Sequence, residues 1–97
     1  MKRQIIWSDD AEEDYANNIE YLLAEWTVND AQEFVDNADN VIRIITEMPK
    51  SFPPSDYKKV RKALICKQIS LLYQIKKSEI ILLRFWNNLQ DPEKLKL

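Results

Sequence analysis

The residues best suited to chemistry in this chain are cations in its last third. A basic segment over residues 57–65 is followed, after an apolar stretch, by an arginine inside a run of Leu, Phe and Trp. Cations grouped on a small β-sheet are typical of surfaces that bind RNA or an acidic protein partner. The residues expected to contact a nucleic acid or a protein target are Lys58, Lys59, Arg61, Lys62, Lys67, Arg84, Trp86 and Asn87.

Residue types that are missing from the chain exclude several other chemistries. There is no histidine, so imidazole acid–base catalysis is excluded and a zinc site is not expected. There is no glycine, which excludes the glycine loops that cradle nucleotide phosphates. Cys66 is the single cysteine and cannot form an internal disulfide. We therefore expect neither a cofactor nor a metal.

The charges divide along the chain. Residues 1–50 contain 4 Lys and Arg against 12 Asp and Glu, whereas residues 51–97 contain 10 against 4. The two halves either contact different partners or neutralise each other within the fold. Each cation named above therefore has two interpretations, a contact with a target or a solvated side chain that pairs with an acid. Trp86 likewise either packs in the core or stacks on a base.

The first half of the chain is predicted to form a strand and two helices. Residues 4–7 are a short apolar run of the kind found in strands. Apolar residues then recur at steps of three and four over residues 8–26, which predicts a helix with one buried face. The same spacing returns over residues 31–48, where Thr27 or Asn29 can cap the second helix. The short connection predicts an antiparallel helical hairpin.

The second half is predicted to form three antiparallel strands. They are expected at residues 57–65, 69–75 and 79–85, joined by short turns. The chain order is then β-α-α-β-β-β, an α+β fold in which a helical hairpin packs on a four-stranded, mainly antiparallel sheet. At 97 residues a single domain over 1–97 is expected. The core is expected to include Trp7, Trp26 and Tyr73.

This order resembles the RelE/ParE superfamily of bacterial toxins over nearly the whole chain. The resemblance is most specific from Arg61 to Leu95, where an arginine-bearing strand precedes Leu-Leu-Tyr-Gln-Ile, a charged turn, Ile-Leu-Leu-Arg-Phe-Trp and Asn-Asn-Leu-Gln-Asp-Pro-Glu-Lys-Leu. Ile-Ile-Trp-Ser before an acidic helix start is also similar. The resemblance implies the RelE/ParE toxin fold, a cytoplasmic location, and a growth-inhibiting toxin of a type II toxin–antitoxin (addiction or plasmid-stabilisation) module, neutralised by a cognate antitoxin.

The superfamily holds two activities. RelE-like members cleave messenger RNA on the ribosome without a metal, and ParE-like members poison DNA gyrase. In a nuclease, Lys59, Arg61 and Arg84 would be the catalytic cations of this chain. However, the arginine that RelE-like nucleases carry just before the Leu-x-Tyr-Gln run is Ser70 here, and the tail lacks their tyrosine or histidine. The pattern is therefore closer to ParE-like sequences.

The sequence thus favours a toxin that binds a protein target such as DNA gyrase. A ribosome-dependent mRNA endoribonuclease is the alternative, and a small RNA-binding module is a third hypothesis. The expected partners are the antitoxin and either gyrase or the ribosome with its mRNA, without a membrane. A homodimer and a hetero-oligomer with the antitoxin are both compatible with the sequence.

Overall fold

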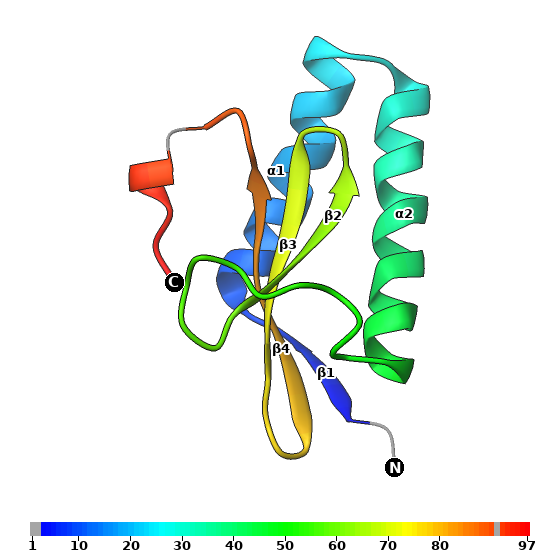
Figure 1. The fold of residues 1–97 in the computed structure, drawn as a ribbon. Coiled ribbons are helices and arrows are strands. Elements are labelled where there is room, and N and C mark those ends of the chain that lie inside the picture. Colours follow the sequence, from blue (N-terminus) through cyan, green and yellow to red (C-terminus); the bar gives the residue numbers. More distant parts are fainter. Residues whose placement is uncertain (1–2, 91) are drawn as a thin grey trace.

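The computed structural model describes residues 3–90 and 92–97. The elements are β1 (Gln4–Trp7), α1 (Asp9–Glu25), α2 (Val28–Glu47), β2 (Arg61–Cys66), β3 (Ile69–Ile75), β4 (Glu79–Asn87) and the 3₁₀ turn η1 (Pro92–Lys94). The strands form one sheet in the order β1-β4-β3-β2, in which only β1 and β4 are parallel. The α1–α2 hairpin covers one face of this sheet (Figure 1). The predicted α+β fold and its element order are confirmed.

Both helices begin where side chains can satisfy their free backbone N–H groups. The Ser8 hydroxyl accepts a hydrogen bond from the Ala11 N–H at the start of α1. At the start of α2, Thr27 and Asp30 form a reciprocal capping box. Thr27, rather than Asn29, is therefore the cap, and α2 begins at Val28. Neither helix, among the described residues, is long and apolar enough to span a bilayer.

The main core lies between the helices and the sheet. Rings from β1, α1, α2 and β4 meet there: Trp7 stacks on Phe85 at 5.3 Å, and Tyr15 and Phe34 contact Phe85 at 5.3 and 6.1 Å between ring centroids. Aromatic pairs of this kind contribute beyond the area they bury. Tyr73 and Trp7 pack in this core as predicted.

Trp26 is not in the core, contrary to the sequence-based expectation. It is 50% exposed at the end of α1, and its indole N–H donates to the Tyr21 hydroxyl at 3.3 Å. The helix ends at Glu25, so Trp26 already leaves the helical path and its side chain no longer follows the buried face. Leu22, one turn earlier, is the last buried apolar residue of α1.

The first predicted strand of the basic half is shorter than expected. It begins at Arg61, because residues 57–60 form a turn in which the Val60 N–H donates to the Tyr57 carbonyl at 3.1 Å. Lys59 occupies this turn with φ of 61°, the only positive φ among the described residues. Such a φ favours glycine, but the chain has none. Lys58 and Lys59 therefore lie outside the sheet and do not follow strand alternation.

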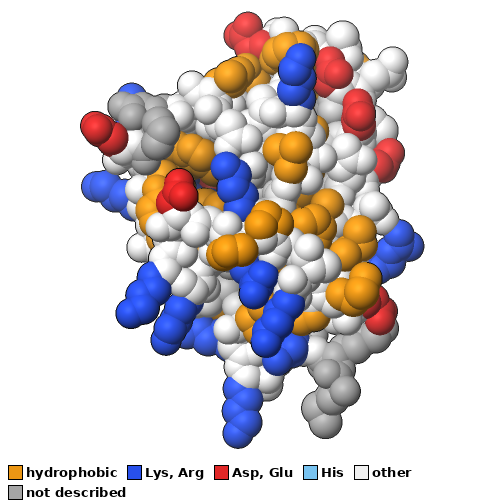
Figure 2. All heavy atoms as spheres, in the orientation of Figure 1, with side chains coloured by type: hydrophobic (Ala, Val, Ile, Leu, Met, Phe, Trp, Pro, Cys, Tyr) orange, Lys and Arg blue, Asp and Glu red, His pale blue; other side chains and the backbone are white. Residues whose placement is uncertain are grey.

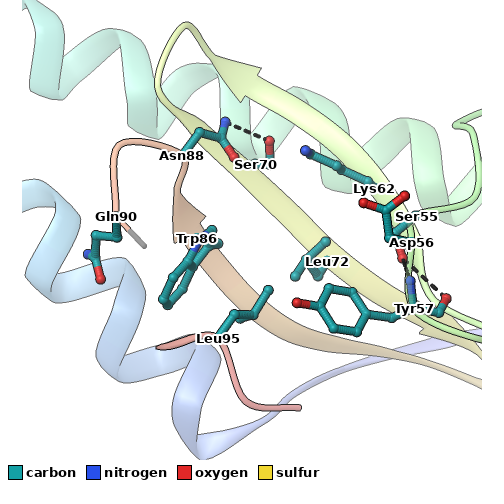
Figure 3. Close-up of a pocket in the computed structure, with 10 residues that line it drawn as sticks. All are labelled: Ser55, Asp56, Tyr57, Lys62, Ser70, Leu72, Trp86, Asn88, Gln90 and Leu95. Atoms are coloured by element: carbon teal, nitrogen blue, oxygen red, sulfur yellow. Dashed lines mark hydrogen bonds between the residues drawn. The ribbon is translucent and has the colours of Figure 1, made fainter. Parts of the chain in front are cut away.

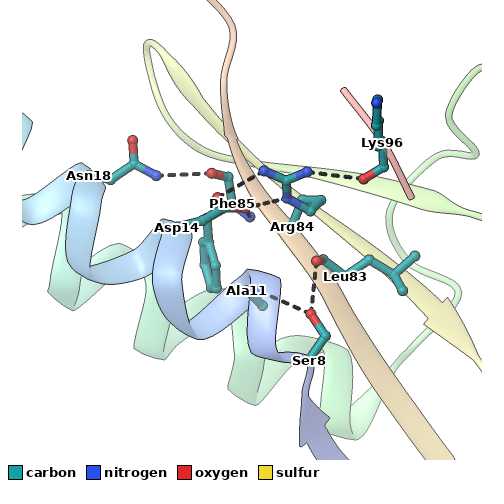
Figure 4. A network of polar contacts seen from close by, with 8 residues as sticks. All are labelled: Ser8, Ala11, Asp14, Asn18, Leu83, Arg84, Phe85 and Lys96. Carbon is teal, nitrogen blue, oxygen red and sulfur yellow. Dashed lines mark hydrogen bonds and ion pairs between the residues drawn. The ribbon is translucent and has the colours of Figure 1, made fainter. Parts of the chain in front are cut away.

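The edge of β4 extends past the end of β1 and is sealed by α1. The Ser8 N–H donates to the Leu82 carbonyl at 3.0 Å and its hydroxyl to the Leu83 carbonyl at 2.9 Å. Further along, Asp14 accepts from the Phe85 N–H at 3.1 Å, and the Asn18 amide donates to the Phe85 carbonyl at 2.9 Å (Figure 4). Polar side chains of the helix thus replace a neighbouring strand at this edge.

We predict that Asp14→Ala destabilises the fold by roughly 2–3 kcal/mol. The Asp14 carboxylate accepts from Nε of Arg84 at 2.6 Å, from Nη2 of Arg84 at 3.0 Å and from the Phe85 backbone. All three donors lose their charged acceptor in the variant. Urea unfolding measures the effect, with Glu13→Ala, an exposed neighbour on α1, as the matched control. Equal unfolding midpoints for the two variants would contradict the role given to Asp14.

We predict that Lys59→Gly stabilises the fold by up to about 1 kcal/mol, because glycine adopts a positive φ without the Cβ clash. The matched control is Lys58→Gly, which removes the same charge from the neighbouring turn position. That change relieves no positive φ, so it should lower stability by adding freedom to the unfolded chain. Thermal unfolding of both variants tests the assignment, and a lower melting temperature for Lys59→Gly than for Lys58→Gly would contradict it.

Candidate functional site

The sheet face opposite the helices carries a second, smaller apolar cluster. Val60, Leu72 and Trp86 are buried there, and Leu83 and Leu95 pack against them. Val60 comes from the connection between α2 and β2, which crosses in front of the strands, and Leu95 comes from the C-terminal tail (Figure 1). Two irregular segments therefore cover part of a face that the helices leave open.

A pocket of about 280 Å³, which we call the open-face pocket, lies beside this cluster (Figure 3). Leu72, Trp86 and Leu95 give it an apolar side. Ser70 and Asn88 lie at one end, where the Asn88 amide donates to the Ser70 hydroxyl at 3.0 Å. Clefts with an apolar lining and a few placed polar groups are the usual form of protein binding sites.

The opposite end of the pocket carries its ionisable groups. Lys62 projects from β2, and Asp56 and Tyr57 come from the turn that precedes that strand. The pocket thus holds one cation, one carboxylate and one phenol. This set can bind a partner side chain that has both apolar and polar parts, but a single lysine places little positive charge on a phosphate.

Arg84 lies next to the pocket but is already engaged. Its guanidinium forms a two-point ion pair with Asp14, and Nη1 donates to the Lys96 carbonyl at 3.0 Å. The hydrogen bond with Asp14 is the main reason that the pKa of Arg84 is raised, and burial opposes it. The same guanidinium lies 5.4 Å from the centroid of the Trp86 ring, a cation–π contact.

Arg61 and Tyr73 hold the connection that leaves α2. These residues are paired on β2 and β3, and the Arg61 Nη1 donates to the Phe52 carbonyl at 2.6 Å. The Tyr73 hydroxyl donates to the Pro49 carbonyl at 2.6 Å. Burial raises the pKa of Tyr73, and the nearby Arg61 charge partly offsets that rise.

The predicted binding residues are thus divided among separate places. Lys62 and Trp86 line the open-face pocket, and Asn87 is buried beside it with its side-chain oxygen accepting the Leu89 N–H at 2.9 Å. Lys59 and Arg61 share a second pocket with Ile75. Lys67 lines a third with residues that include Trp26 and Glu33. Lys58 is exposed in the turn. Whether any of them contacts a target stays a prediction.

Several pocket residues were missed by reasoning from the sequence. They are Ser55, Asp56, Tyr57, Asn88, Gln90 and Leu95. All of these residues lie in turns or in the tail, outside the strands and helices, so no periodic pattern in the sequence indicates that they contact the sheet. The Pro-rich connection and the polar tail were the only local signals, and neither indicates where the segment folds back.

Comparison with known proteins assigns the family. The sequence profile described as the ParE toxin of the type II toxin–antitoxin system parDE matches residues 5–92. The chain belongs to the ParE toxin family. A search of curated protein sequences found no match.

Several solved structures share this fold. A chain of the chromosomal ParDE system of P. aeruginosa is 18% identical, with a TM-score of 0.76 over 89% of this ParE-family chain and 96% of that chain. The YoeB dimer of Staphylococcus aureus gives 15% identity and 0.62 over 88% and 95%. A chain of the E. coli DinJ–YafQ complex gives 12% identity and 0.60 over 90% and 93%. At these identities the likeness shows a shared fold.

For this ParE-family chain we predict a loss of stability at high pH that depends on Tyr73. Because burial raises its pKa above the ordinary value of 10.0, the folded protein holds the phenol protonated where the unfolded chain begins to ionise. The protonated Tyr73 phenol therefore contributes its full stabilisation below about pH 10, and this stabilisation is lost as the pH rises through the pKa of Tyr73 in the folded protein. The Tyr73→Phe substitution should lower the free energy of unfolding by about 1 kcal/mol at pH 7. Above about pH 10, the free energy of unfolding of this variant should fall less steeply with pH than that of the unchanged chain.

Urea unfolding between pH 7 and 11 measures both effects. Some decline remains in the Tyr73→Phe variant, because the pKa of Tyr15 is also raised, first by burial and then by Asp39 and Asp36. Tyr57→Phe, which changes an exposed residue on the pocket rim, is the control. An unchanged alkaline slope in Tyr73→Phe would contradict the assignment.

Proposed function

We propose that this chain is a single-domain toxin of a type II toxin–antitoxin module that stops growth by binding a protein target, with DNA gyrase the first candidate. The observation that carries the choice is Ser70. At the position where RelE-like nucleases carry an arginine, this chain has a hydroxyl that is fully buried on β3 and bonded to Asn88. A buried neutral hydroxyl cannot stabilise the charge of a phosphorane.

The other candidate catalytic cations support the same choice. RNA cleavage by the 2′-hydroxyl needs cations and proton carriers around one phosphate. Arg84 is paired with Asp14, and Lys59 and Arg61 line a different pocket from Lys62. A phosphate in the open-face pocket would therefore meet Lys62 without the other cations.

An antitoxin is the second proposed partner. The open face offers an apolar floor at Leu72 and Trp86, and Leu64 on the edge strand β2 is 60% exposed on the same side. An extended antitoxin segment can add to an edge strand and place alternate side chains in pockets. The cations of the chain's second half would attract an acidic segment. In this proposal the growth inhibition comes from binding the target, and an antitoxin made in the same cell is consistent with a cytoplasmic location.

The endoribonuclease remains the second candidate because Lys62, Asp56 and Tyr57 line one pocket. In that case the phenol of Tyr57 or the carboxylate of Asp56 would transfer protons and Lys62 would contact the phosphate. The variants Tyr57→Phe and Lys62→Met separate the two functions. The nuclease hypothesis predicts a loss of RNA cleavage of about 10²-fold or more in each variant.

We predict that induction of the chain in a bacterial host arrests growth without new codon-phased RNA 5′ ends, and that Tyr57→Phe still arrests growth. Purified toxin should inhibit supercoiling by gyrase, and co-expression of the antitoxin should restore growth. Growth curves, transcriptome-wide 5′-end mapping and a gyrase supercoiling assay provide the readouts. Codon-phased cuts that disappear in Tyr57→Phe and Lys62→Met would overturn the protein-binding function in favour of the nuclease.

A further inference from the structure

Cations from distant parts of the sequence meet at one end of the molecule, which we call the basic end. It consists of Arg3, Lys50, Lys59, Arg61, Lys76 and Lys77. Figure 2 shows Lys and Arg side chains gathered over the lower part of the face that carries the α2–β2 connection. Cations from both halves of the chain therefore lie close together in space.

Hydrogen bonds and a shared pocket connect these residues. The Arg3 Nε donates to the Lys76 carbonyl at 2.8 Å, which joins the segment before β1 to the β3–β4 turn. The Arg61 Nη1 also reaches the Lys50 carbonyl at 3.4 Å, after the end of α2. Lys59 and Arg61 line one pocket with Ile75, the residue that precedes Lys76. The basic end is therefore one continuous surface.

The pocket at its centre has room for an anionic group. Its volume is about 240 Å³, and Pro54, Val60 and Ile75 complete its lining. Arg61 uses one of its nitrogens, Nη1, for the two backbone carbonyls, so Nε and Nη2 retain donors. Lys59 is exposed on the turn, where its positive φ fixes the direction in which the side chain leaves the backbone. A cation on each side of an apolar floor suits a phosphate oxygen.

Among the residues that the structure describes, acids do not form ion pairs with these charges. Within residues 3–90 and 92–97, no ion pair joins Lys59, Arg61, Lys76 or Lys77 to a carboxylate, and the ion pair that does form is between Arg84 and Asp14. Glu79 follows the β3–β4 turn and bonds to Lys76 through its backbone carbonyl. Repulsion among neighbouring cations is relieved by an external anion.

We propose that the basic end binds the phosphodiester backbone of a nucleic acid without reading its sequence. The surface is built mainly from turns. Its strand residue, Arg61, begins the edge strand β2, but the Lys62 N–H already donates to the Pro53 carbonyl at 3.0 Å, so this part of the edge is not open to an extended acidic peptide. Lysines on separate turns act as point charges that can follow a repeating row of phosphates. The acidic first half of the chain, which forms both helices, restricts this contact to one end. The proposal does not depend on which protein the toxin inhibits.

Binding to short labelled duplex DNA, followed by fluorescence anisotropy at several salt concentrations, tests the proposal with the full chain. Affinity should fall with salt at a log–log slope of about −3, as expected for roughly three neutralised phosphates. The double variant Lys76→Gln with Lys77→Gln should weaken binding by roughly tenfold and make the slope shallower, with its magnitude reduced by about 2. Lys59→Gly should weaken binding while leaving the protein folded, which thermal unfolding verifies.

Lys94→Gln is the matched control, since it removes one positive charge from the exposed 3₁₀ turn η1 of the C-terminal tail, which lies away from the basic end (Figure 1). Its affinity should equal that of the unchanged chain. Single-stranded RNA of the same length identifies which nucleic acid supplies the phosphates, and tight binding of either supports the proposal. Three results would overturn it: no salt-dependent binding, equal binding by the lysine variants and Lys94→Gln, or stronger competition by polyglutamate than by unlabelled nucleic acid. The gyrase assay is a separate readout, so either proposal can fail alone.

Discussion

The outer edge of β4 between Leu82 and Phe85 lies beyond the end of β1, and α1 satisfies its hydrogen bonds. Ser8, Asp14 and Asn18 each contribute a polar group to this edge. Without them, backbone groups in the middle of the sheet would be buried unpaired or open to another strand. The same contacts fix the helical hairpin against β4, and with it the packing of Phe85 among the aromatic rings. Core packing and edge sealing therefore depend on one another.

The ion pair between Asp14 and Arg84 connects α1 to the face of the sheet that the helices leave open. Arg84 also donates to the Lys96 carbonyl, so the tail that places Leu95 over Trp86 is connected to α1 through one guanidinium. A side chain committed to three acceptors is poorly available to a substrate. Arg84, which the sequence suggested as a catalytic cation, thus stabilises the fold here. The cation that lines the open-face pocket is Lys62.

Charge in this toxin is separated in space. The helices carry most of the acids, and the cations of the basic end, which lie mainly in turns, form no ion pair within the described part of the chain. Exposed ion pairs would contribute little to stability, so the fold tolerates their absence. The separation leaves one face suited to an acidic protein segment at the sheet and one end suited to phosphates. These two surfaces can be occupied independently because they are built around different pockets.

Features that depend on neighbours a few positions apart could be predicted from the order of the residues. The start of the second helix near Thr27, the two buried helix faces, the strand runs and the element order all follow from local hydrogen bonds and side-chain periodicity. Local patterns did not predict that Lys59 lies in a turn, that Trp26 is exposed, or that Arg84 pairs with Asp14 seventy residues away; these follow from how the segments pack together. It also decided which turn and tail residues line the open-face pocket. Those outcomes depend on contacts between segments that are distant in the sequence and meet only in the folded protein. Such contacts produce no periodic pattern in the sequence.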